Sequence, residues 1–270
     1  MRFIDSYVKS PFAGIAPWIL MSVVSGPGRL EAAAAAALGL ALLTLWVGSR
    51  RGGHVHLLEV FGVAYFGVLV VLGLAAPEGT VRWLSLWSGE LSNIALTVFA
   101  IFTLLIRRPF TLAYAKETTP REFWDSPLFR RINYVISTVW AGAFLFSTVV
   151  GAYGIAVLRD NDDFLTGWIL QIAGTIFAVS FTEFYPDYAS AKFAQSVGEP
   201  TDPPPSLARL LDWLPSSVVV TGIVGWVTHA FPDAVGIALI AVGTVGSMAM
   251  RRFFPDKGTE GSPAAESSGP

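Results

Sequence analysis

Cysteine is absent from the 270-residue sequence, and histidine occurs only three times, as His54, His56 and His229. Without cysteine the chain forms no disulfide, thiolate metal site or thiol nucleophile, although this absence leaves the redox compartment open. A haem needs histidines that face each other within a bundle, and a zinc site at His54 and His56 needs a third ligand nearby. We therefore expect no metal or other cofactor and interpret these histidines as solvated residues near the membrane surface.

Charged residues are also scarce. They make up 14% of the chain, against roughly 25% in an average soluble domain. Hydrophobic residues make up 53%, and the mean hydropathy is +0.56. The net charge is only -2, and the basic residues sit in short connections, so nucleic acid is not an expected partner. This composition predicts a multi-pass membrane protein.

Eight apolar runs are candidates for membrane segments, because a helix needs roughly 20 apolar residues to cross a hydrocarbon core about 30 Å thick. We predict an all-α, polytopic transmembrane bundle of about eight segments. The first and seventh runs are short, and each either crosses the membrane or folds back as a re-entrant hairpin. The first run contains prolines and lacks a cleavage site of small residues, which favours a retained helix over a signal peptide. The eight runs are residues 11–26, 29–49, 55–76, 83–106, 132–157, 164–183, 214–230 and 233–250.

The positions of lysine and arginine predict the orientation, because short cytoplasmic connections collect positive charge. If all eight segments cross, fifteen basic residues lie on one side and three on the other. If the first segment is re-entrant, the difference falls to thirteen basic residues against five, so eight crossings with both termini in the cytoplasm are favoured. With eight crossings, the side with few basic residues holds Arg29, Arg82 and Arg159. The side with many, which we expect to be cytoplasmic, holds Arg2, Lys9, Arg50, Arg51, Arg107, Arg108, Lys116, Arg121, Arg130, Arg131, Lys192, Arg209, Arg251, Arg252 and Lys257.

Residues 107–131 form the most polar long connection, with the sequence RRPFTLAYAKETTPREFWDSPLFRR. Aromatic and charged residues are interleaved in it, and Thr119-Pro120 interrupts it. This pattern predicts two short amphipathic pieces at the headgroup level of the membrane. We expect the connection to be the main cytoplasmic anchor and the best candidate for a contact surface. The residues expected to form that surface are Arg107, Arg108, Lys116, Trp124, Arg130 and Arg131.

The turn WDSP within this connection has two interpretations. Asp125 and Ser126 could be catalytic, but no histidine or second carboxylate stands beside them to activate a nucleophile. Alternatively, Ser126 caps a helix whose first residue is Pro127, which is a common start signal. We favour the cap, and we expect no catalytic residues in the chain.

Three ionisable or amide residues lie well inside predicted membrane segments, where such groups are costly and often functional. Glu90 and Asn93 are three residues apart and therefore share a helix face, and Gln171 lies at a comparable depth. They are either a polar patch for a proton, an ion or a small polar solute, or a set of hydrogen bonds that hold helices together. Glu59, close to the end of its segment, is expected to be interfacial.

The chain is expected to divide into a membrane domain (1–193), a proline-rich cytoplasmic linker (194–212), a transmembrane hairpin (213–254) and a disordered tail (255–270). Small residues, such as Gly39 in the second run and Gly236, Gly243 and Gly246 in the last, predict close helix packing or association with a second copy.

Residues 1–190 resemble a known family. The first segment, IDSYVKSPFAGIAPWIL, is short and contains prolines. Later come GTVRWLSLW, RRPFTLAYAKE, FWDSPLFRRINYVISTVWAGAFL and NDDFLTGWILQI. This order is similar to that of the intracellular septation protein A family of bacterial inner-membrane proteins. The resemblance implies a role in cell division and envelope maintenance through contacts with other membrane proteins, and it brings no catalytic residues. The segments after residue 190 are an addition to the family's pattern.

Two functions are therefore expected. The first is a non-enzymatic septation-like protein of the bacterial inner membrane that binds lipids and other envelope or division proteins. The second is a transporter of a small solute or ion that uses Glu90, Asn93 and Gln171. A weak internal repeat motivates the transporter hypothesis. Residues 55–116 and 132–192 each have the pattern of two helices followed by a connection that begins at a proline. A lipid-modifying enzyme is the least supported alternative.

Overall fold

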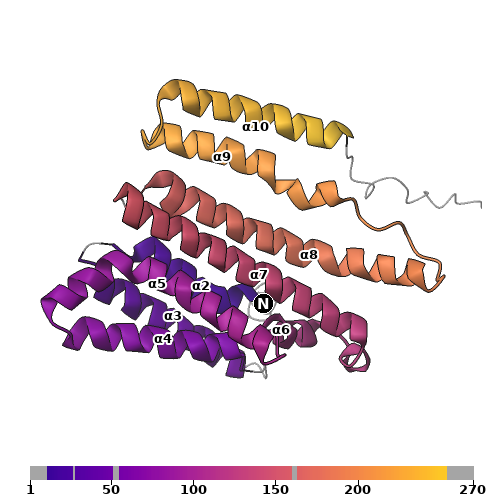
Figure 1. Cartoon of the computed structure of the whole chain (residues 1–270), viewed down its shortest axis with the longest axis horizontal. Helices are drawn as coiled ribbons and strands as arrows, with labels where there is room; N and C mark the ends of the chain where they lie inside the picture. The colour runs from indigo at the N-terminus through magenta and orange to yellow at the C-terminus, as the bar shows by residue number, and fades with distance from the viewer. Residues whose placement is uncertain (1–10, 27, 51–54, 160–162, 254–270) are drawn as a thin grey trace, which may run out of the picture. The chain divides into compact units, whose positions relative to one another are not determined.

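The structure is a computed structural model that describes residues 11–26, 28–50, 55–159 and 163–253. Throughout these ranges the chain forms helices joined by short connections, and no strand occurs in them (Figure 1). The prediction of an all-α bundle is confirmed. His54, the N-terminal Arg2 and Lys9, and the tail at 255–270 lie outside the described residues. In chain order the elements are α2 (Pro11–Val24), α3 (Leu30–Arg50), α4 (Leu57–Ala75), α5 (Glu78–Leu105), α6 (Thr111–Thr118), η1 (Arg121–Phe123), α7 (Pro127–Tyr153), η2 (Gly154–Leu158), η3 (Phe164–Ile169), α8 (Leu170–Ser196), η4 (Leu207–Leu211), α9 (Trp213–Val227) and α10 (Asp233–Phe253).

Seven helices in the described part of the chain are long and apolar enough to cross a membrane. They are α3, α4, α5, α7 with η2, η3 with α8, η4 with α9, and α10. The first predicted segment is also helical, but α2 has only 14 residues and is therefore about 21 Å long. It is too short to cross a hydrocarbon core of about 30 Å without thinning of the bilayer.

The chain divides into two compact units, Met1–Pro204 and Pro205–Pro270. In the first unit α2 packs against α3, α4 and α5. Its Trp18 is 2% exposed and stacks on Phe61 and Tyr65 of α4 at centroid distances of 5.6 and 4.9 Å. On α3 the alanines Ala33, Ala34, Ala37 and Ala41 are buried. Such small side chains let neighbouring helices approach closely, which is how apolar helices gain packing energy in lipid.

The second half of this unit is organised around α7, which packs against α5, α6 and α8. Trp140 of α7 is buried, and its Nε1 donates to Thr182 Oγ1 of α8 at 3.0 Å. The short helix α6 is held to α7 by Thr111, whose Oγ1 donates to the Asn133 carbonyl at 3.0 Å and lies 2.7 Å from Ser137 Oγ. These bonds are buried, so α6 is a fixed part of the bundle.

The start of α7 confirms the predicted cap. Ser126 Oγ accepts a hydrogen bond from the Phe129 amide at 3.1 Å, and Pro127 is the first helical residue. The helix therefore begins five residues before the predicted apolar run. Asp125 is exposed and pairs with Arg130 at 2.7 Å.

The predicted helix end before Pro186 is wrong. Pro186 lies inside α8, which continues to Ser196, whereas the corresponding Pro109 does follow the end of α5. A proline inside a helix removes one backbone hydrogen bond. Helices that pack on neighbours tolerate this loss, and α8 packs on α7. The segments that begin at Pro109 and Pro186 are therefore similar in composition but differ in structure.

The second unit is a hairpin of α9 and α10 in which glycines make the close contacts. A Cβ on Gly243 would lie 2.7 Å from the Pro215 carbonyl oxygen and 2.8 Å from the Val219 amide nitrogen, and one on Gly236 would lie 2.7 Å from Trp226 Cβ. The predicted close packing at these glycines is confirmed. At Gly39 a Cβ would meet nothing within 4 Å, so this glycine makes no close contact among the described residues, and association with a second copy stays a prediction there.

Replacement of Gly243 by alanine should destabilise this hairpin by about 1–3 kcal/mol, because backbone atoms of α9 would have to move. Thermal unfolding in detergent, followed by circular dichroism, measures the change. Gly39→Ala is the matched control and should leave the melting temperature unchanged or slightly raised, since alanine favours helix. Equal effects of the two substitutions would contradict the packing described here.

Candidate functional site

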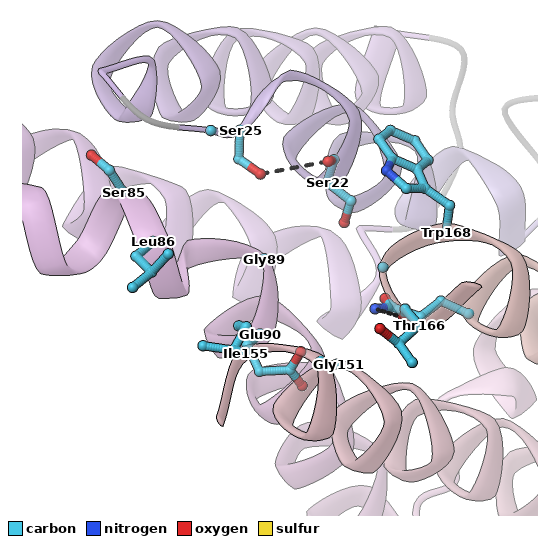
Figure 2. Close-up of a pocket in the computed structure, with 14 residues that line it drawn as sticks. Ser22, Ser25, Ser85, Leu86, Gly89, Glu90, Gly151, Ile155, Thr166 and Trp168 are labelled. Atoms are coloured by element: carbon cyan, nitrogen blue, oxygen red, sulfur yellow. Dashed lines mark hydrogen bonds between the residues drawn. The ribbon is translucent and has the colours of Figure 1, made fainter. Parts of the chain in front are cut away.

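Glu90 is the central residue of the candidate site. It lies on α5, is only 4% exposed and is directed at α7 (Figure 2). A Cβ on Gly151 of α7 would lie 1.8 Å from Glu90 Oε2. The carboxyl group therefore occupies space that only a glycine at position 151 leaves open.

The structure brings the other two predicted polar residues to the same place. Asn93 Nδ2 donates to Gln171 Oε1 at 3.0 Å and so joins α5 to α8. Gln171 Nε2 donates to the Thr166 carbonyl at 3.0 Å and lies 3.0 Å from the position of a Cβ on Gly151. Gln171 is thus held from two sides, next to the Glu90 carboxyl. The Asn93–Gln171 bond is of the kind expected for helix packing.

Glu90 differs from its neighbours because its Oε1 has no hydrogen-bond partner among the described residues. The carboxyl borders a cavity of about 70 Å³. One water needs roughly 10–15 Å³ of such volume, so there is room for several. The described lining includes no lysine, arginine or histidine. Its polar residues, apart from Glu90, are Ser22, Ser25, Ser85, Thr166 and Gln171.

Two irregular helical turns form one wall of this cavity. Gly154 and Ile155 belong to η2, and Thr166, Gly167 and Trp168 belong to η3 (Figure 2). Both turns are π-helical, a wider winding that is rare and is frequent at functional sites. A regular continuation of α7 and α8 would present different side chains to Glu90.

Asp163 fixes the start of η3. One oxygen of its carboxylate, Oδ2, accepts from the Thr166 amide at 2.7 Å and from Thr166 Oγ1 at 2.8 Å. These bonds favour the charged form and lower the pKa of Asp163 below its usual 3.8. A lowered folded-state pKa means that the cap stabilises the fold above about pH 4, and that this stabilisation is lost as the pH falls through the lowered value.

A second buried polar cluster lies where α6 meets the start of α4. His56 is 3% exposed. Its Nδ1 lies 3.1 Å from Glu59 Oε1 and its Nε2 lies 3.2 Å from Glu117 Oε1. The ring stacks on Tyr114 at a centroid distance of 4.0 Å. Burial, and then the charges of Glu59 and Glu117, raise the pKa of Tyr114.

The prediction of a solvated His56 is therefore wrong, and Glu59 beside it is also buried within the protein. The sequence showed both residues at the end of an apolar run, but not that α6 folds back over that end. The two carboxylates approach different ring nitrogens of His56, so they do not converge on one point. Among the described residues, no group of three histidine or acidic side chains is arranged to hold a metal ion.

The basic residues of the 107–131 connection lie on a separate surface. Most of them line an open groove of about 950 Å³ beside α6. Arg131 is exposed and is not part of the lining. The groove contains five of the six residues predicted for the contact surface, namely Arg107, Arg108, Lys116, Trp124 and Arg130.

The fold and these sites define a multi-pass helical membrane protein with a buried carboxyl beside a polar cavity. Comparisons with protein-family models, with curated proteins and with solved structures found no match.

Several residues of the site could not be identified from the sequence. Gly151 resembles any small residue of a membrane helix, and Ser22, Ser85 and Thr166 match the ordinary polar content of helix ends. The signal that was visible is the presence of Glu90 within an apolar run, together with Asn93 one turn later.

Gly151→Ala should displace the Glu90 carboxyl and destabilise the protein by about 1–3 kcal/mol. In a Glu90→Ala background the same substitution should cost much less, because the atom it collides with is gone. A double-mutant cycle on unfolding free energies in detergent measures this coupling.

Gly142→Ala on the same helix is the matched control, because a Cβ there meets nothing within 4 Å. It should show no coupling to Glu90. Additive effects of Gly151→Ala and Glu90→Ala would contradict the geometry of the site.

Proposed function

We propose that the protein binds a proton or a small monovalent cation at Glu90 and moves it across the membrane. The observation that carries this proposal is the buried carboxyl, with one oxygen unpartnered among the described residues, at the edge of a polar cavity. Ionisable groups at such places commonly mark ion and proton pathways. This is the second of the two functions expected from the sequence.

Helix packing alone is a weaker explanation of Glu90. Asn93 and Gln171 already join α5 to α8, and they do so as neutral amides. A carboxylate in an apolar environment is costly unless its charge is compensated. Since the described lining of the cavity has no basic residue, we infer that a bound proton or cation provides the compensation.

The chemistry of the cavity supports a small, hard cation. The carboxylate, the serine hydroxyls and the Thr166 hydroxyl offer oxygen atoms, and the described lining contains no histidine. Oxygen donors favour protons and alkali cations over transition metals. Gln171, held by Asn93 and by the Thr166 carbonyl, keeps its amide in a fixed position beside the carboxyl.

We propose the cytoplasmic membrane of a bacterium as the location, with the arginine-rich connections in the cytoplasm. The cavity involves the first half of α5, whereas Arg107 and Arg108 follow its other end. In this orientation the cavity would open towards the outer side. Transport would then require a second opening of the Glu90 site towards the cytoplasm.

Glu90→Gln should reduce pH-driven proton flux at least about tenfold, because the amide keeps the shape but cannot exchange a proton. The measurement uses the full chain in lipid vesicles that contain a pH-sensitive dye, with valinomycin and potassium setting the voltage. Parallel vesicles loaded with sodium distinguish a proton from a sodium ion. Glu78→Gln, an exposed carboxylate at the start of the same helix, is the matched control. Unchanged flux in folded Glu90→Gln would remove the basis of the proposal.

A second candidate is a non-enzymatic septation-like role through contacts with other membrane proteins. It rests on the sequence resemblance, and it is favoured by the exposure of Arg107, Arg108, Arg130 and Arg131 on the connection. Charge reversal at these four residues should then reduce recovery of partners after in-membrane crosslinking, while Glu90→Gln should have no effect. The opposite pattern would exclude this role and favour transport.

A further inference from the structure

The groove beside α6 has a strong excess of positive charge. Its lining includes four basic residues and one acidic residue, Asp125. Asp125 pairs with Arg130 at 2.7 Å, and both side chains are largely exposed, so this pair contributes little binding energy. The other three basic residues of the lining, Arg107, Arg108 and Lys116, form no ion pair with an acidic residue in the described part of the chain. The groove is therefore suited to an anion.

The end of α5 brings both arginines to the groove. The Arg108 amide donates to the Thr103 carbonyl at 2.9 Å, and Arg107 has a φ of 57°. This is a helix-closing turn in which glycine usually takes the left-handed position. Arg107 adopts that position here, so two adjacent guanidinium groups follow directly after a membrane-spanning helix. Guanidinium groups bind phosphate oxygens through paired hydrogen bonds.

Aromatic contacts hold the third cation in place. Lys116 Nζ lies 5.0 Å from the ring centroid of Trp124, and Trp124 Nε1 donates to the Thr119 carbonyl at 2.9 Å. The ring is therefore fixed, and the ammonium group stays over its face. A tryptophan fixed next to basic residues is typical of the membrane interface.

The remaining wall of the groove is apolar. Val55 and Leu57 line it and are 56% and 50% exposed. Phe110 and Leu112 also line it. Leu105 and Ile106, the last residues before the arginines in the chain, are also exposed. A free phosphate ion would leave the exposed Val55 and Leu57 in water, whereas a lipid would cover them with its acyl chains.

We propose that this groove binds the headgroup of an anionic phospholipid. Arg107, Arg108 and Lys116 contact the phosphate, and the apolar wall contacts the upper part of the acyl chains. A zwitterionic headgroup carries its own ammonium group and gains less from the excess of positive charge, so the site selects anionic lipids such as phosphatidylglycerol. This site is separate from Glu90 and does not depend on the transport proposal.

Binding of lipid to the purified full chain in detergent tests the proposal. Native mass spectrometry counts the lipids that remain bound after addition of phosphatidylglycerol or phosphatidylcholine. Wild type should bind phosphatidylglycerol roughly tenfold more tightly than phosphatidylcholine, given the contribution expected from several basic residues. Arg108→Gln with Lys116→Gln should abolish this preference. Equal binding of the two lipids by wild type would overturn the proposal.

Arg131→Gln with Arg252→Gln is the matched control. It removes the same charge from two exposed arginines that do not line the groove, and it should leave the preference intact. Loss of the preference in the control would show a nonspecific charge effect and overturn the site. Arg108→Lys with Lys116→Arg keeps the charge and should retain most of the preference, which distinguishes lost binding from lost folding.

Two further measurements identify the source of the phosphate. Sodium phosphate or glycerol phosphate alone should not raise the melting temperature as phosphatidylglycerol does, and an equal rise would indicate a site for a soluble anion. A photoreactive residue at position 112 should crosslink to lipid in membranes. Crosslinking to a protein with no lipid adduct would overturn the proposal in favour of a protein contact surface.

Discussion

Inside a membrane there is no water to compensate a polar group, so each one must find its partner within the protein. Much of this structure follows from that constraint. The hydroxyls of Ser92, Thr97 and Thr182 donate to carbonyl oxygens one turn earlier in their own helices. The amides of Asn93 and Gln171 bond each other. Glu90 Oε1 is one of the exceptions, because it lacks a partner in the described ranges, and it borders a polar cavity.

Both candidate sites lie where regular helical winding stops. The Glu90 cavity is walled by the π-helical turns η2 and η3, and the basic groove begins at the left-handed Arg107. Irregular backbone in a membrane protein is tolerated where it is buried in protein or lines a cavity. It also aims side chains in directions that an uninterrupted helix does not reach. Residues at helix ends therefore contribute to both sites, whereas Glu90 itself lies near the middle of α5.

The sequence predicted the elements better than their boundaries. Apolar run length was sufficient to locate the seven helices of the described residues that are long and apolar enough to cross a membrane, since lipid imposes a minimum length on such a helix. Ser126 was recognised as a cap because capping depends on local chemistry. Pro186 was misjudged, because a proline ends a helix only where the lost hydrogen bond is not offset by packing, and the packing of α8 on α7 is tertiary. His56 was misjudged for a similar reason, since its burial depends on α6, which is distant in sequence.

The sequence alone determined the class of protein, the presence of an intramembrane carboxyl and the basic character of the 107–131 connection, because composition and run length act locally along the chain. Only the tertiary structure decided that Gly151 leaves room for Glu90 and that Gln171 is held beside it. Only the tertiary structure, likewise, separated Arg130, which lines the groove, from Arg131, which does not. These are facts about which helix faces meet. Such contacts depend on packing between distant segments, so they cannot be read from the residue types of any one segment.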